Sequence, residues 1–120
     1  MNTKPAVCQK ITIDGNEYVL TAPQSKPSNV SIVRTQSAGV FMGEIVSRNG
    51  QEVEMRNVRR LWYWEGAASL SQLAMEGVSK PGKCKFPCPV TSITLPQAVE
   101  ILQCTEAAVA NVNAVPIWQS

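Results

Sequence analysis

The residues between 59 and 69 combine side-chain types that could bind a nucleotide. The stretch is Arg59-Arg60-Leu61-Trp62-Tyr63-Trp64-Glu65-Gly66-Ala67-Ala68-Ser69, with two guanidinium groups, three aromatic rings and the expected start of a helix. Aromatic faces stack on bases, arginine pairs with phosphate through two N–H groups, and the free N–H groups of a first helical turn bind anions. We therefore predict that a nucleotide-derived ligand contacts Arg59, Arg60, Trp62, Trp64, Ala67 and Ser69.

A structural interpretation of the same stretch stays open. Tryptophan side chains are usually highly buried, so Trp62 and Trp64 could belong to the core. The two arginines could then extend along apolar surface to water or form ion pairs with glutamates such as Glu52, Glu54 or Glu65.

The segment 78–89 carries a second set of candidate residues. Its sequence, Val-Ser-Lys-Pro-Gly-Lys-Cys-Lys-Phe-Pro-Cys-Pro, holds three prolines and three lysines, which excludes long regular structure. We predict a mobile loop that closes over an anion with Lys83, Lys85 and Phe86. A solvated lysine loop that only keeps the protein soluble would have the same sequence.

Catalytic and metal-binding patterns are weak in this chain. It has no histidine, the side chain most often used as a general acid or base near neutral pH. No Walker A, G-x-G-x-x-G, H-E-x-x-H or G-x-S-x-G motif is present. We predict a binding protein with no catalytic residue and no cofactor.

The four cysteines allow a zinc site, although their spacing argues against one. Cys84 and Cys88 are close in sequence, whereas Cys8 and Cys104 are distant and isolated. A four-thiolate site normally uses two close pairs, so inert thiols are favoured and we predict no metal. A small zinc module that contacts nucleic acid is the corresponding alternative.

The composition is that of one globular domain. The chain has 120 residues, of which 44% are hydrophobic and 17% charged, so we predict a single domain over residues 1–120. A net charge of +2 is too small to indicate a nucleic acid polymer or a membrane as partner. Because no apolar stretch resembles a signal peptide or a membrane span, we predict a cytoplasmic protein with reduced cysteines.

The elements that must position these residues are mostly strands. The expected fold is α+β: an antiparallel β-sheet-rich single domain with two short helices. We expect a hairpin over 7–20 around Asp14-Gly15-Asn16, strands over 29–35, 39–48 and 51–64 with a turn at Asn49-Gly50, a helix over 67–76, a strand over 90–95, a strand or helical turn over 98–102, and a helix over 107–112 capped by Thr105.

Strand alternation separates the two arginines. In the strand that ends near residue 64, a period of two places Val58, Arg60, Trp62 and Trp64 on one face and Arg59, Leu61 and Tyr63 on the other. Only one of the arginines can then contact a given ligand directly. The aromatic residues and the apolar tail at 115–118 further predict a homo-oligomer.

Three blocks of sequence resemble an uncharacterised family of small phage and prophage proteins. The blocks cover residues 34–43 (RTQSAGVFMG), 59–74 (RRLWYWEGAASLSQLA) and 77–87 (GVSKPGKCKFP). The layout is also similar to the phage anti-Thoeris sponge proteins, which sequester cyclic ADP-ribose signals. The resemblance implies an oligomer of β-rich subunits that holds the intact signal in a host bacterial cytoplasm. It also implies that Phe86 closes over the ligand and that Arg59 or Arg60 binds it.

Two classes of function follow. The first is a phage-encoded sponge that sequesters a cyclic ADP-ribose-like or cyclic nucleotide immune signal without cleaving it. The second is a structural or interaction protein of a phage that docks a face rich in Trp and Arg on another protein.

Overall fold

The computed structural model describes residues 8–13, 16–21 and 26–119. The first described elements are β1 (Cys8–Ile13) and β2 (Asn16–Thr21), which pair antiparallel as a two-stranded sheet of their own. This confirms the predicted hairpin. Part of its predicted turn, Asp14 and Gly15, lies outside the described residues.

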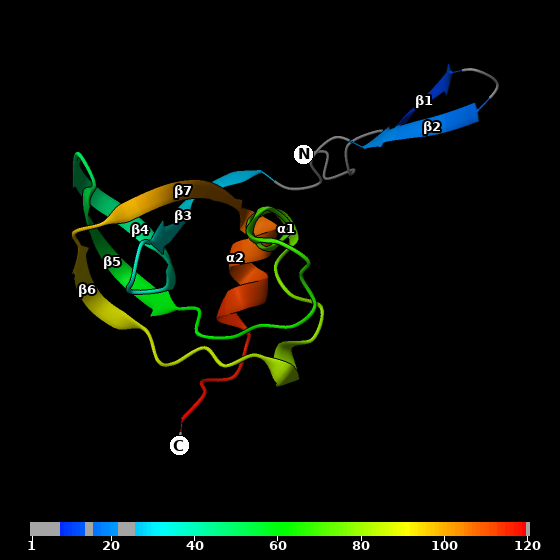
Figure 1. Ribbon diagram of the computed structural model, residues 1–120. Coiled ribbons are helices and arrows are strands. Elements are labelled where there is room, and N and C mark those ends of the chain that lie inside the picture. The colour runs from blue at the N-terminus through cyan, green and yellow to red at the C-terminus, as the bar shows by residue number, and fades with distance from the viewer. Residues whose placement is uncertain (1–7, 14–15, 22–25, 120) are drawn as a thin grey trace.

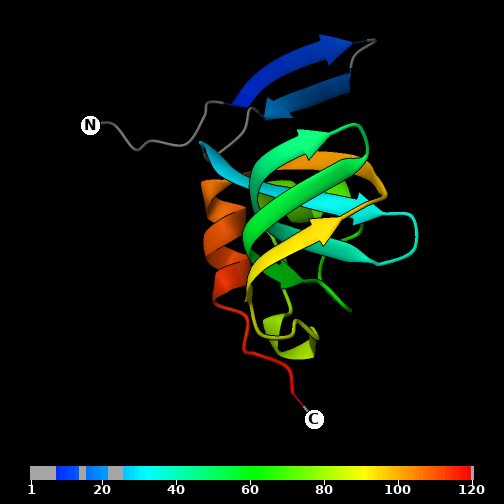
Figure 2. The ribbon, with the colours of Figure 1, turned by 90° about the vertical axis from the view of Figure 1, so that its left-hand side faces the viewer.

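The main body is an antiparallel five-stranded sheet with the strand order β6-β5-β4-β3-β7 (Figure 1). Its strands are β3 (Pro27–Thr35), β4 (Val40–Asn49), β5 (Glu52–Arg60), β6 (Val90–Leu95) and β7 (Ala98–Thr105). The two edge strands, β6 and β7, are separated in sequence only by residues 96 and 97. The sheet must therefore curl until its edges meet at that end, and Figures 1 and 2 show this curl.

The hairpin of β4 and β5 turns where the sequence predicts. Asn49 pairs with Glu52, so Gly50 and Gln51 form a two-residue turn. Gly50 has φ of 62°, a conformation that glycine adopts without steric cost and that tight hairpins require.

Strand β5 is shorter and less regular than the sequence predicts. It ends at Arg60 rather than at Trp64, so the predicted strand over 51–64 is wrong in its last four residues. Asn57 has φ of 50° and lies where the pairing with β4 shifts by one residue, which is a β-bulge. The bulge changes which side of the sheet the following side chains face.

Both helices begin and end at capping residues. In α1 (Leu70–Glu76) the Ser69 side chain accepts a hydrogen bond from the Gln72 backbone N–H, and Gly77 follows the last turn. In α2 (Glu106–Asn113) the Thr105 side chain accepts from the Ala108 backbone N–H. The two helices and the antiparallel sheet confirm the α+β prediction, and the ambiguous segment after residue 98 is strand β7.

Apolar side chains fill both sides of the sheet. The helix-side cluster lies between the sheet and the helices, and the strand cluster lies on the opposite side. The helix-side cluster contains Ile32, Met42, Leu61, Leu73, Ala74, Val78, Cys84, Phe86, Cys104, Val112 and Val115. The strand cluster contains Val33, Phe41, Val53, Met55, Val58, Leu95 and Ala98. Because adjacent residues such as Ile32 and Val33 enter different clusters, the central strands are apolar on both faces.

Neither described helix is long and apolar enough to cross a membrane.

Candidate functional site

Arg59 is buried where three segments of the chain meet, and its side chain joins them. Its side chain is 5% exposed and extends from β5 toward the helix side. Its guanidinium donates hydrogen bonds of 2.8 to 3.1 Å to the backbone carbonyls of Phe86, Pro87, Val112, Val115 and Pro116. One side chain thus fastens the 78–89 segment and the end of α2 to the sheet.

The environment of Arg59 does not leave it free for a ligand. All its hydrogen-bond partners are carbonyl oxygens, and burial lowers the pKa of Arg59, while the charge of Cys88 acts in the opposite direction. Binding a phosphate would require breaking bonds that hold two backbone segments. We therefore leave Arg59 out of the candidate surface.

The segment 78–89 is packed against the body in this structure. A short 3-10 helix spans Pro81–Lys83, and Lys85 pairs with Tyr63 through backbone hydrogen bonds. Phe86 is 0% exposed and belongs to the helix-side cluster. The expected lid aromatic is thus a core residue here, whereas Lys83 and Lys85 are exposed.

The expected anion site at the start of α1 is occupied by the chain itself. The helix begins at Leu70, three residues after the predicted start, and the Ser69 hydroxyl caps it. The Ala68 N–H donates to the side-chain oxygen of Gln72. Ala67 is partly buried against the helix-side cluster.

The two tryptophans have different surroundings. Trp64 is partly buried and packs against the helix-side cluster. Trp62, by contrast, is 62% exposed, far more than is usual for tryptophan.

Three backbone segments lie side by side next to Trp62 and carry exposed aromatic side chains. Lys85 pairs with Tyr63, and the Trp118 N–H donates to the Phe86 carbonyl. The Lys85 Nζ lies 5.8 Å from the centre of the Tyr63 ring and 5.7 Å from that of the Trp118 ring. The exposed side chains on these segments are Trp62, Tyr63, Lys85, Ile117 and Trp118, and we call them the aromatic surface.

The candidate residues of the sequence analysis account for only part of this surface. Trp62 and Lys85 were predicted, whereas Tyr63 and Trp118 were not. The signal for Trp118 was the apolar tail, which packs on the chain's own body through Val115 and leaves Ile117 and Trp118 exposed. Tyr63 donates a hydrogen bond of 2.8 Å to Glu65, and this bond raises the pKa of Tyr63.

Arg60 lies on the opposite side of the sheet from Arg59. Its guanidinium carbon is 4.7 Å from the centre of the Phe41 ring, which belongs to the strand cluster. This placement confirms that alternation separates the two arginines. Arg60 is therefore not part of the aromatic surface.

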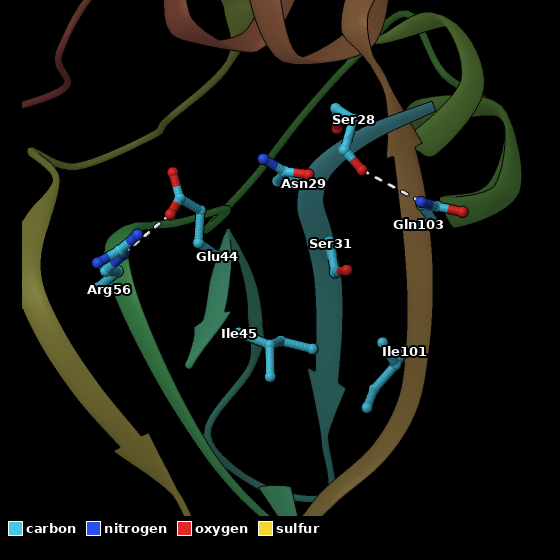
Figure 3. Close-up of a pocket in the computed structure, with 8 residues that line it drawn as sticks. All are labelled: Ser28, Asn29, Ser31, Glu44, Ile45, Arg56, Ile101 and Gln103. Carbon is cyan, nitrogen blue, oxygen red and sulfur yellow. Dashed lines mark hydrogen bonds and ion pairs between the residues drawn. The ribbon is translucent and has the colours of Figure 1, made fainter. Parts of the chain in front are cut away.

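A polar pocket lies elsewhere, among residues that the sequence did not single out (Figure 3). It has a volume of about 570 Å³ and is lined by Ser28, Asn29, Ser31, Glu44, Ile45, Arg56, Ile101 and Gln103. Arg56 and Glu44 form an ion pair of 2.9 Å within it, so its charges largely neutralise each other. A second pocket, of about 300 Å³, lies beside α2 and includes Arg59.

The described cysteines differ in accessibility. Cys84 and Cys104 are buried, whereas Cys88 is exposed. Burial raises the pKa of the Cys104 thiol to about 12, which keeps it protonated near neutral pH. Within residues 8–13, 16–21 and 26–119, no three Cys, Asp or Glu side chains are grouped closely enough to hold a metal ion.

Comparison with known proteins gives one match. A family model described as "Domain of unknown function (DUF6948)" matches residues 28–112, which is the five-stranded sheet with both helices. No curated protein and no solved structure matches the chain.

Proposed function

The chain belongs to the family of the domain of unknown function DUF6948, and we propose that it is a non-catalytic binding protein that docks its aromatic surface on another protein. The observation that carries the proposal is the position of the Lys85 ammonium between the exposed rings of Tyr63 and Trp118, with a third exposed ring, Trp62, on the segment paired with Lys85. Tryptophan and tyrosine are enriched among the residues that contribute most to protein interfaces. Exposed aromatic area of this kind gains free energy when a partner removes it from water.

The shape of the aromatic surface favours a macromolecule over a small ligand. Small-molecule sites are concave and enclose most of the ligand. Neither the pocket of Figure 3 nor the pocket beside α2 is lined by a residue of the aromatic surface.

The charge of the surrounding residues indicates the partner's chemistry. Lys80, Lys83 and Lys85 are all exposed on the segment that crosses the aromatic surface. An acidic partner would complement these lysines and bind faster as a result. The partner face we propose therefore combines an apolar depression for Trp62 with acidic residues near Lys85.

The chemistry of the exposed groups also supports binding without catalysis. Within the aromatic surface the titratable groups are Tyr63 and Lys85. The hydrogen bond to Glu65 raises the pKa of Tyr63, so its hydroxyl stays protonated near neutral pH and does not act as a base there.

Site-specific photocrosslinking tests the proposal. A photoreactive residue placed at Trp62 or Trp118 in cells should give a discrete crosslinked protein, identified by mass spectrometry. The same residue at Val46 or Met75, which are exposed apolar positions elsewhere, serves as the matched control. A crosslink to a second copy would identify the predicted homo-oligomer. Crosslinking that is absent at 62 and 118, or equal at all four positions, would contradict the proposal.

A second candidate function is the nucleotide sponge, and the position of Lys85 favours it. An ammonium group between two exposed aromatic rings offers both stacking faces for a base and a charge for a phosphate. In that case a second copy would have to enclose the ligand. Incubation with cyclic nucleotides and cyclic ADP-ribose isomers, followed by heat denaturation, should then release the intact ligand, and Lys85→Ala should abolish its capture.

A further inference from the structure

A small apolar slot lies beside Arg60, apart from the aromatic surface. Its walls come from Phe41 and Val58 in the strand cluster, from Val90 at the start of the edge strand β6, and from Cys88 just before that strand. Its volume is about 190 Å³, smaller than the pockets of drug-sized ligands. A single ring or a short aliphatic chain is the largest group that it can accept.

Arg60 brings an unpaired positive charge to this slot. Arg60 takes part in neither of the ion pairs that join two described residues, Arg34 with Glu100 and Arg56 with Glu44. The Arg60 guanidinium lies over the Phe41 ring, with its carbon 4.7 Å from the ring centre. Because that ring covers one face of the guanidinium, its position is restrained while the N–H groups on its edge remain available.

We propose that this slot binds a small apolar carboxylic acid, with the carboxylate on the Arg60 guanidinium and the hydrocarbon part among Phe41, Val58 and Val90. Two parallel N–H···O bonds match the geometry of a carboxylate to that of arginine. The apolar walls favour a ligand that has a hydrocarbon part over a simple anion. This site is separate from the proposed docking surface and does not depend on it.

Titration with phenylacetate, followed by two-dimensional amide NMR, tests this site. We expect saturable shifts at Cys88, Val90 and Ile93, which line the slot. Acetate, which lacks the ring, and 2-phenylethanol, which lacks the charge, should each bind at least about tenfold more weakly, the ratio that corresponds to about 1.4 kcal/mol. If acetate binds as well as phenylacetate, or if phenylacetate gives no saturable shift, the proposal is overturned.

Two variants assign the effect to the slot. Arg60→Gln removes the charge, and Val90→Glu adds a repelling carboxylate at an exposed edge position. Each should weaken phenylacetate binding at least about tenfold, whereas Arg48→Gln, an exposed arginine at the far end of the β4 hairpin, should leave it unchanged. Equal affinity in the wild type and Arg60→Gln would overturn the proposal, and amide spectra of the free variants verify that both remain folded.

Discussion

Arg59 and Arg60 are adjacent in sequence and have opposite surroundings. Arg59 is buried on the helix side, with its hydrogen bonds divided among five backbone carbonyls. Arg60 is exposed on the other side, stacked on one aromatic ring and without an ion pair among the described residues. The first arginine holds the structure together, and the second is available to a ligand.

The difference shows that residue type alone does not assign a role to an arginine. Both side chains can bind an anion, and both lie in the same arginine-aromatic stretch. What separates them is strand alternation, which directs one toward backbone carbonyls of the chain itself and the other toward solvent. A buried guanidinium with five N–H donors suits a place where several backbone segments end without regular pairing.

The largest expected effect comes from removing the buried guanidinium. Arg59→Met keeps much of the side-chain volume but removes the guanidinium donor from five carbonyl oxygens. Those of Phe86 and Val112 keep a backbone donor, so the oxygens of Pro87, Val115 and Pro116 are the ones left exposed to the loss. Each orphaned acceptor costs about 1 to 3 kcal/mol, and relaxation toward water recovers part of that. We expect a loss of at least about 3 kcal/mol in the free energy of unfolding, measured by urea denaturation.

The conservative variant Arg59→Lys sharpens this test. Lysine keeps the charge but has one ammonium group, which cannot reach carbonyls on two separate segments at once. It should recover less than half of the loss. If Arg59→Met has the same free energy of unfolding as the wild type, the hydrogen bonds to the carbonyls contribute nothing to stability. Arg59 would then be a candidate for ligand binding again.

An effect of similar size distinguishes two aromatic residues close to Lys85: Phe86, which follows it in sequence, and Trp62, which lies on the segment paired with it. Phe86 is 0% exposed and Trp62 is 62% exposed. Phe86→Ala should leave a cavity in the helix-side cluster and cost about 3 to 5 kcal/mol, whereas Trp62→Ala should change stability by less than about 0.5 kcal/mol. Thermal unfolding of both variants checks this, and equal destabilisation would contradict the assignment of Trp62 to a free docking surface.

The sequence predicted the elements of the fold well because their signals are local. The Asn49-Gly50 turn, the Ser69 and Thr105 caps and the alternating strands each depend on residues close in the chain, and all are present. The end of β5 was placed too late because tryptophan and tyrosine also favour strands. There the chain pairs with residue 85 instead, a contact that no local pattern encodes.

The candidate site was predicted less completely for a related reason. Trp62 and Lys85 were identified from their types, but Trp118 approaches Lys85 only through the tertiary fold. Phe86 and Arg59 were assigned to a ligand because burial is not visible in an isolated stretch of polar and aromatic residues. Asn29, Ser31 and Gln103 carry no sequence motif, and the pairing of β3 with β7, which are distant in sequence, brings them to one pocket.

An effect of intermediate size is the pH dependence of the free energy of unfolding, which should differ between variants of a buried thiol, Cys104, and of an exposed one, Cys88. Cys104 belongs to the helix-side cluster, and burial raises its pKa from 9.0 to about 12. As the pH rises, the Cys104 thiol ionises in the unfolded chain before it ionises in the folded protein. The contribution of this thiol to the free energy of unfolding is therefore complete below about pH 9 and is lost between pH 9 and 12. Relative to wild type, Cys104→Ala should lose about 1 kcal/mol less of its free energy of unfolding between pH 9 and 10.

The exposed thiol is the control for that measurement. Cys88 lines the Arg60 slot and is exposed, so Cys88→Ala should retain the wild-type pH dependence between pH 9 and 10. If the two variants behave alike, Cys104 is not held protonated by the core.

The smallest expected effect is that of Arg60 on stability. Arg60→Ala removes the stacking of the guanidinium on Phe41, a contact worth about 0.5 to 1 kcal/mol at exposed sites. No hydrogen bond or ion pair of the described residues is lost with it, so urea denaturation should give a loss of about 1 kcal/mol at most. Arg34→Ala, which breaks the exposed ion pair with Glu100, gives a comparison of similar size, since such pairs contribute about 0 to 1 kcal/mol. A loss as large as that of Arg59→Met would mean that both arginines are structural. Because the contrast between them rests on their different partners, that result would also remove the reason for assigning a ligand to Arg60.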